Sequence, residues 1–158
     1  MLEPTRRRPD FGPNYGIEAA PEGMLDWAWA DERLERSRNY WIGTADEDGR
    51  PRAIPVWGVW IDDSVVFGTN ARSRKAINLE RDARVVVHLE SGDEVVILEG
   101  EVETIEVTDE IADAFKPKYD WRPEVGGGDS TRWYRLRPVL AQAWTESEYP
   151  KTATRFDF

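Results

Sequence analysis

Cysteine is absent from this chain of 158 residues, and histidine occurs only once. The lack of cysteine excludes a disulfide framework, a zinc–thiolate centre and a thiol nucleophile, and it fits a reducing compartment such as the cytoplasm. The single histidine, His88, lies in an apolar strand-like run, where a histidine is more often a structural group than a base or a metal ligand. We therefore expect no metal centre and identify no catalytic side chain.

Long apolar runs are also missing. No stretch approaches the roughly 20 residues that a membrane-spanning helix needs. The N-terminal residues include Arg6, Arg7 and Arg8 but no apolar segment of a secretory signal. Acidic residues outnumber basic ones by 31 to 21, which gives a net charge of −10. Nucleic acids and anionic membranes repel a chain of this sign, so the sequence favours a small-molecule partner.

Proline, glycine and charge dominate residues 1–20, which we interpret as an extended arm with its three arginines in a loose tail. The pattern predicts a domain over residues 21–145 and a polar C-terminal tail over 146–158. A helix is expected over 21–38, a short one after Ser73 and another after Thr108. Strands are expected over 40–45, 52–60, 65–69, 84–90, 95–105 and 132–144. Short strands joined by hairpin turns such as the one ending at Gly49 indicate a mainly β fold, a small antiparallel barrel.

The most informative segment follows the strand that ends at Thr69. Ser73 is expected to cap a helix, and Arg72, Arg74 and Lys75 place three cations at its N-terminus. Isolated helices prefer acids there, because the free N–H groups of the first turn carry partial positive charge. The helix after Thr108 has the usual order, with Asp109 and Glu110 in its first turn. A bound phosphate would explain the inverted order after Ser73. The alternative is that Arg72 and Arg74 pair with Glu80 and Asp82 on a solvated face.

The two commonest glycine-rich phosphate loops, Gly-x-x-x-x-Gly-Lys and Gly-x-Gly-x-x-Gly, do not occur. The run Thr69-Asn70-x-x-Ser73-Arg74-Lys75 resembles the phosphate-binding segment of the pyridoxamine 5'-phosphate oxidase-like flavin-binding split barrels. The preceding hairpin, from Asp48 to Trp57, is similar to the strand that runs along the flavin ring in that family. The resemblance covers roughly residues 40–105, and it implies a split β-barrel with Greek-key-like antiparallel connections.

The resemblance also implies a cofactor site. Thr69, Ser73, Arg74 and Lys75 would hold the cofactor phosphate, and Gly68 is also expected among the cofactor-binding residues. Pro55, Val56 and Trp57 would border the ring system, although Trp57 taken alone is as well explained as an ordinary core residue. Arg52 would reach the phosphate or a substrate anion, but its spacing does not match the first flavin arginine of the family. Pro55 is expected at a sheet edge or at an irregularity that faces a ligand.

Two departures argue against pyridoxamine phosphate oxidation itself. The lysine that binds substrate phosphate in the true oxidases is replaced by the run Trp57-Gly58-Val59-Trp60, and no histidine follows His88. The shorter bacterial relatives, which use FMN or the deazaflavin F420, match better. The resemblance therefore implies an oxidoreductase that passes hydride to a small acceptor. It also implies a homodimer with the cofactor at the subunit interface, which the eight tryptophans would suit. The alternative is a non-catalytic flavin- or haem-binding stress or sensor protein.

Overall fold

The strands of this protein close into a barrel. The computed structural model describes residues 3–158. Six strands form a closed antiparallel ring in the order β7-β4-β3-β2-β5-β6, and β6 pairs back with β7. These strands are β2 (Asn39–Ala45), β3 (Pro51–Ile61), β4 (Ser64–Asn70), β5 (Arg84–His88), β6 (Glu94–Ile105) and β7 (Thr131–Thr145). Strands β2, β3 and β4 follow one another and β5 returns beside β2, which is a Greek-key connection. The predicted mainly β split barrel is confirmed.

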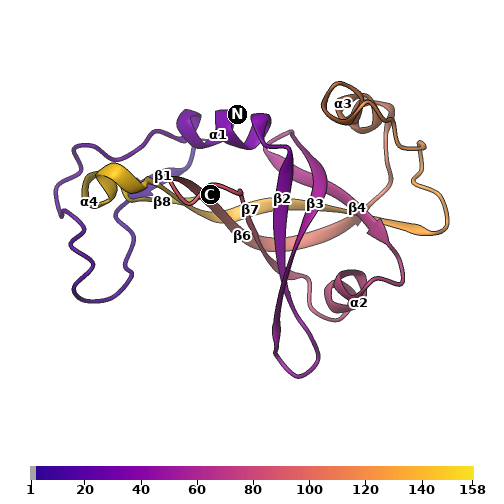
Figure 1. Cartoon of the computed structure of the whole chain (residues 1–158), viewed down its shortest axis with the longest axis horizontal. Coiled ribbons are helices and arrows are strands. Elements are labelled where there is room, and N and C mark those ends of the chain that lie inside the picture. The colour runs from indigo at the N-terminus through magenta and orange to yellow at the C-terminus, as the bar shows by residue number, and fades with distance from the viewer. Residues whose placement is uncertain (1–2) are drawn as a thin grey trace.

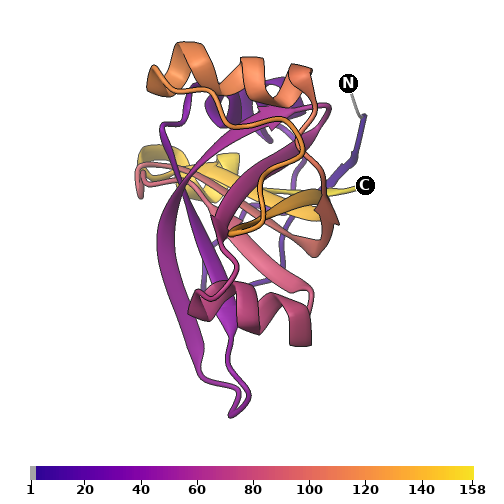
Figure 2. The same ribbon diagram turned by 90° about the vertical axis from the view of Figure 1, so that its right-hand side faces the viewer.

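Three helices cover the barrel. Helix α1 (Trp27–Arg36) and helix α3 (Asp109–Tyr119) lie on one side, and α2 (Arg74–Arg81) lies on the other side beside the long β2–β3 hairpin (Figures 1 and 2). Leu34 of α1 and Leu79 of α2 belong to the core inside the barrel, together with Ile42 and Phe67. Helix α3 packs outside, where Phe115 forms a second core with residues such as Val66 and Trp133. No helix in residues 3–158 combines the length and the apolar character that crossing a membrane requires.

The first helix is shorter than predicted, since it begins at Trp27 and not at Pro21. Gly23 has φ of +87°, a left-handed conformation that interrupts a helix, and the amide of Met24 donates to the carbonyl of Pro21 in a turn. The helix also ends at Arg36, two residues early. The apolar spacing therefore predicted a helix in residues that instead form a turn, and this turn packs against Lys151.

The expectation of a loose arginine tail is wrong. Residues Thr5–Arg7 form β1, which pairs with β8 (Thr154–Asp157). Arg6 pairs with Asp26, and Arg7 Nε lies 2.6 Å from Asp157 Oδ2. Arg8 donates to the backbone carbonyls of two segments, Ala20 and Glu22 in one and Lys151 and Ala153 in the other, the last at 2.9 Å. The partners are distant in sequence, so no local pattern could indicate them.

The C-terminal residues are likewise more ordered than a polar tail. A 3₁₀ turn (Glu146–Glu148) and α4 (Tyr149–Thr152) lead into β8, which also pairs with β7. Phe156 is completely buried, and its ring lies 5.2 Å from that of Trp27, centroid to centroid. Burial of this ring stabilises β8 on the barrel, and β1 at the other end of the chain is held there by its pairing with β8.

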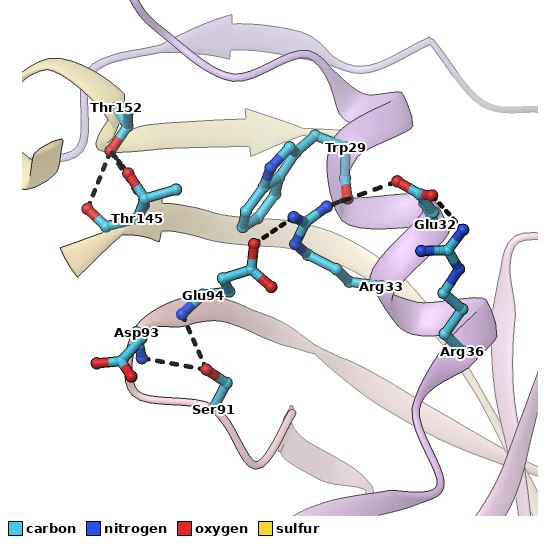
Figure 3. Close-up of polar contacts among 9 residues, drawn as sticks. All are labelled: Trp29, Glu32, Arg33, Arg36, Ser91, Asp93, Glu94, Thr145 and Thr152. Atoms are coloured by element: carbon cyan, nitrogen blue, oxygen red, sulfur yellow. Dashed lines mark hydrogen bonds and ion pairs between the residues drawn. The ribbon is translucent and has the colours of Figure 1, made fainter. Parts of the chain in front are cut away.

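Helix α1 is fixed to the barrel by Arg33. Its guanidinium lies 3.6 Å from the centroid of the Trp29 ring, and it pairs with Glu94 at the start of β6 (Figure 3). The same side chain donates to the carbonyl of Trp29 at 3.0 Å, while Glu32 pairs with Arg36 on the outer face. A cation held between a ring and a carboxylate restricts the position of the helix more than an exposed ion pair would.

Candidate functional site

Strands β3 and β4 are paired along only part of their length. Residues 51–57 of β3 pair with β2, whereas pairing with β4 begins at Gly58, opposite Phe67, and ends at Ile61. Beyond Phe67, β4 pairs with β7 but has no ladder with β3. We call the resulting gap the β3–β4 opening. It leaves one edge of each strand available to a ligand. Pro55 lies in the open half of β3, as expected for a residue that has no N–H to donate.

Helix α3 holds the point where the strands separate. The amide of Gly58 donates to the hydroxyl of Tyr119 at 2.9 Å, in place of a strand partner. That hydroxyl lies 2.7 Å from Gly58 O and 2.6 Å from Arg38 O, to one of which it donates. Lys118 Nζ donates to Gly58 O at 3.3 Å and to the hydroxyl of Tyr40 at 3.0 Å. The backbone at Gly58 is thus held by hydrogen bonds to Tyr119 and Lys118, of which those to Tyr119 are buried.

The turn between β4 and α2 brings Thr69 and Ser73 together. Their hydroxyl oxygens are 3.1 Å apart, and Ser73 caps α2 by accepting from the amide of Ala76 at 3.2 Å. Asn70 orders the turn, because its side-chain oxygen accepts from Arg72 N and its carbonyl accepts from Ser73 N. The predicted cap at Ser73 is confirmed.

The cations at this helix N-terminus have no acidic partners in the part of the chain that the structure describes. Among residues 3–158, no carboxylate lies within 4.0 Å of the charged groups of Arg72, Arg74 or Lys75. The acids proposed as partners are engaged elsewhere: Glu80 pairs with Arg132 at 3.3 Å, and Asp82 pairs with Arg84 at 2.7 Å. The alternative of a salt-bridged surface face is therefore wrong.

Lys75 is half-buried, and burial lowers the pKa of its ammonium group. A desolvated cation without a counter-ion is unfavourable, especially beside the positive end of a helix. The backbone amides of Arg74 and Lys75 lie in the first turn, where an N–H group has no carbonyl acceptor within the helix. An anion at this position would accept from those amides and offset the charge, which is the donor set that suits a phosphate.

The residues predicted beside the ring system lie on the other side of the β3–β4 opening. Val56 is partly buried and packs against the barrel core. Trp57 is 46% exposed, so it is not a core residue. Its ring stacks on that of Tyr119, and the Arg38 guanidinium lies 5.7 Å from its centroid.

Gly68 faces the ring of Trp133 so closely that a Cβ there would lie 2.8 Å from the ring. Trp57, Gly68 and Thr69 share a cavity of about 250 Å³ with residues of α3 and the following loop. The structure thus brings Gly68, Thr69 and Ser73 to one side of the opening and Pro55 to Trp57 to the other.

Arg52 is separate from this group. It lies near the end of the β2–β3 hairpin, where its Nη2 is 3.2 Å from Asp46 Oδ2. Two backbone amides, those of Asp48 and Arg50, also donate to Asp46, and the pKa of this carboxyl is lowered chiefly by the Arg50 amide. No contact joins Arg52 to the residues at the start of α2.

Sequence reasoning missed a larger cleft on the outer face of the barrel. It has a volume of about 860 Å³, and Arg52 is at its rim. Its walls come from five strands, and the apolar part includes Gly43, Ala45, Pro51, Ala53, Val86 and Val139. Charged residues also line it, namely Arg52, Asp82, Arg84, Glu99 and Glu101. Val86 and Val139 are exposed at 39% and 62%. An apolar residue at an outward position of a strand was the signal that could have revealed this surface.

Known proteins share this fold. A conserved hypothetical protein from Mycobacterium tuberculosis is 23% identical, with 85% of this chain and 89% of that chain covered and a TM-score of 0.66. A protein described as F420 reductase is 21% identical over 77% of this chain and 98% of its own, with a TM-score of 0.56. The haem storage protein HutZ from Vibrio cholerae is 15% identical over 69% and 87%, with a TM-score of 0.57.

Curated proteins give no match to this chain. A sequence model of the family described as pyridoxamine 5'-phosphate oxidase matches residues 28–145, which include the whole β3–β4 opening and the start of α2. The match and the fold agree with the resemblance carried by the run from Thr69 to Lys75. The chain therefore belongs to the pyridoxamine 5'-phosphate oxidase family.

Proposed function

We propose that the protein is an oxidoreductase that binds FMN, or alternatively F420, in the β3–β4 opening. Thr69, Ser73, Arg74 and Lys75 would hold the cofactor phosphate. The observation that carries the proposal is the group of cations without acidic partners at the start of α2, one of them half-buried. When bound, such a cofactor supplies hydride transfer to a small acceptor.

The chain's own residues would bind and orient the cofactor. The open edge of β3 offers backbone groups to the polar rim of a ring system beside Pro55 and Val56. Trp57 would shield one side of the ring from water. The hydrogen bonds from Tyr119 to Gly58 would keep the opening at a fixed width, which limits the reorganisation needed on binding.

The first experiment separates the phosphate from the ring. In the variant Arg74→Ala/Lys75→Ala, FMN affinity should fall by at least about 100-fold, because each of the two charge-assisted contacts removed contributes about 1.5–3 kcal/mol. Riboflavin, which lacks the phosphate, should bind with little change. The control Arg36→Ala/Lys116→Ala removes two exposed cations elsewhere and should not alter either affinity. Equal losses for FMN and riboflavin would contradict the proposal.

The choice of cofactor needs a direct comparison. FMN and F420 should be titrated in parallel by fluorescence, and consumption of NADPH or reduced F420 should then be measured with candidate acceptors. Binding followed by turnover supports the oxidoreductase. If neither cofactor binds, the proposal fails.

We also propose that the protein is a homodimer. The apolar cleft around Gly43, Val86 and Val139 supports a second copy as the partner, since a monomer seldom exposes a large contiguous apolar surface. A single small barrel with an open edge would leave much of a flavin in water, and a two-fold partner would cover it. The acidic net charge of −10 and the lack of cysteine support a small-molecule partner and a cytoplasmic location.

A non-catalytic flavin- or haem-binding protein is the second candidate. It is favoured by the similarity in fold to a haem storage protein and by the lining of the smaller cavity at the opening, where residues 3–158 supply no histidine or carboxylate. The sole histidine, His88, stacks on Trp41 and has its Nδ1 2.7 Å from the carbonyl of Leu89, away from the opening. Binding of haem or FMN without turnover would support this candidate over the oxidoreductase.

A further inference from the structure

The smaller cavity beside the β3–β4 opening has walls of unusual composition. Its volume is about 250 Å³, and no charged side chain lines it. Four of its eight lining residues are aromatic, and three carry polar side chains. The aromatic residues are Trp57, Phe115, Trp121 and Trp133, and the polar ones are Thr69, Asn70 and Thr131.

Two of the tryptophans present their rings to solvent. Trp57 is 46% exposed and Trp121 is 45% exposed, with ring centroids 6.4 Å apart and planes inclined by 54°. Both rest on buried rings: Trp57 stacks on Tyr119, and Trp121 meets the buried Phe115 edge-on at 5.9 Å. Large rings held in fixed positions with free surface form a preorganised surface for another ring.

The third tryptophan has an unused hydrogen-bond donor. Trp133 is buried, and within residues 3–158 its Nε1 has no acceptor. An unpaired buried donor is unfavourable. Gly127 covers this edge of the indole with φ of +89°, and a Cβ there would lie 2.6 Å from Cδ1 and 3.0 Å from Nε1. Any side chain would therefore push the loop away, whereas glycine allows the loop to rest on the indole beside its Nε1.

The volume limits the size of a ligand. An apolar cavity of about 150 Å³ accommodates benzene. A cavity of about 250 Å³ that opens to solvent therefore covers one substituted ring, whereas most of a flavin with three fused rings would extend beyond it. The absence of charged lining residues selects against an ionic ligand, because nothing would compensate its desolvation.

We propose that this cavity binds the ring of a small uncharged aromatic molecule that carries a hydrogen-bond acceptor, such as a carbonyl oxygen. Trp57 and Trp121 contact the ring, and Trp121 determines specificity. The inference rests on the proposed function in one respect: because Thr69 and Trp57 border both the cavity and the proposed cofactor site, the bound molecule is the substrate of that site.

Binding is tested with the full chain by calorimetry, with acetophenone as the probe. Cyclohexyl methyl ketone has the same carbonyl on a saturated ring and should bind at least about 3-fold more weakly, and benzoate should also bind more weakly. Trp121→Ala should weaken acetophenone binding by about 3- to 10-fold, and Trp121→Phe should recover most of it. The control Val125→Ala changes an exposed residue of the same loop that does not line the cavity. In nuclear magnetic resonance spectra, the indole N–H signal of Trp133 should shift on binding.

Equal affinity for the aromatic and saturated ketones, or unchanged binding in Trp121→Ala, would overturn the inference. Because Trp121 is half-exposed, an unfolding midpoint close to that of the parent chain will show that the variant folds. FMN affinity should be unchanged in Trp121→Ala. If acetophenone binds but FMN does not, the proposed function is refuted and the ring-binding cavity is supported. If FMN binds but acetophenone does not, the ring-binding cavity is refuted and the proposed function is supported.

Discussion

The indole of Trp57 stacks on the phenol ring of Tyr119, with centroids 4.6 Å apart and planes inclined by 13°. The hydroxyl of Tyr119 accepts from the amide of Gly58, the next residue after Trp57. One side chain of α3 thus positions both the ring of Trp57 and the backbone at which β3 leaves β2 and joins β4. The geometry of the opening depends on this pair of residues, although they are 62 positions apart in the sequence.

Removal of this hydroxyl should destabilise the protein without removing the stack. Tyr119→Phe leaves the Gly58 amide without its acceptor, so the free energy of unfolding should fall by about 1–3 kcal/mol. Urea unfolding measures the change. The control is Tyr15→Phe, at a tyrosine that is 56% exposed. If both variants lose the same small amount, the Gly58 hydrogen bond does not hold the opening.

Stability should depend on pH through Lys118. Burial lowers the pKa of its ammonium group from 10.5 to about 8. Between these two values the unfolded chain binds more protons than the folded chain, so stability should rise with pH across this window. The rise should be smaller in Lys118→Met, where Lys75, whose pKa is also lowered by burial, still contributes. Urea unfolding of both proteins from pH about 7.5 to about 9.5 gives the comparison, and equal slopes would contradict it.

The tyrosines near Lys118 set the upper limit of the pH range for that experiment. Burial raises the pKa values of Tyr40 and Tyr119, so these side chains stay protonated when folded although they lose protons when unfolded near pH 10. Stability should fall for that reason above pH about 10. The carboxylate of Glu35 raises the pKa of Lys118 and so partly offsets the lowering by burial.

The proposed dimer should dissociate when charge is placed in the outer cleft. In Val139→Asp, a carboxylate would have to lose its water at an apolar position of the interface, so the dimer should weaken by at least about tenfold. Sedimentation equilibrium measures the change. Val125→Asp places the same charge at another exposed valine outside the cleft and should not affect assembly. A parent chain that sediments as a monomer would refute the dimer directly.

Local signals predicted much of the fold. Ser73 and Thr108 were recognised as caps because a cap depends on the residue itself and the next turn of the helix. The hairpin turn at Gly49 is also predicted correctly, because its φ of +77° is a local requirement that glycine meets. The predicted start of the first helix at Pro21 is wrong, because the apolar spacing does not indicate the turn at Gly23.

Residue types and their spacing place a helix cap, free first-turn amides and cations together after Thr69, all within seven residues. Only the tertiary structure decided that these cations have no acidic partners, that β3 separates from β4 at Gly58 and that Tyr119 holds the separation. It also decided that Arg52 pairs with Asp46 away from this group. Strand register, barrel closure and ion pairing join residues far apart in the chain, and their outcome depends on the packing of the whole molecule.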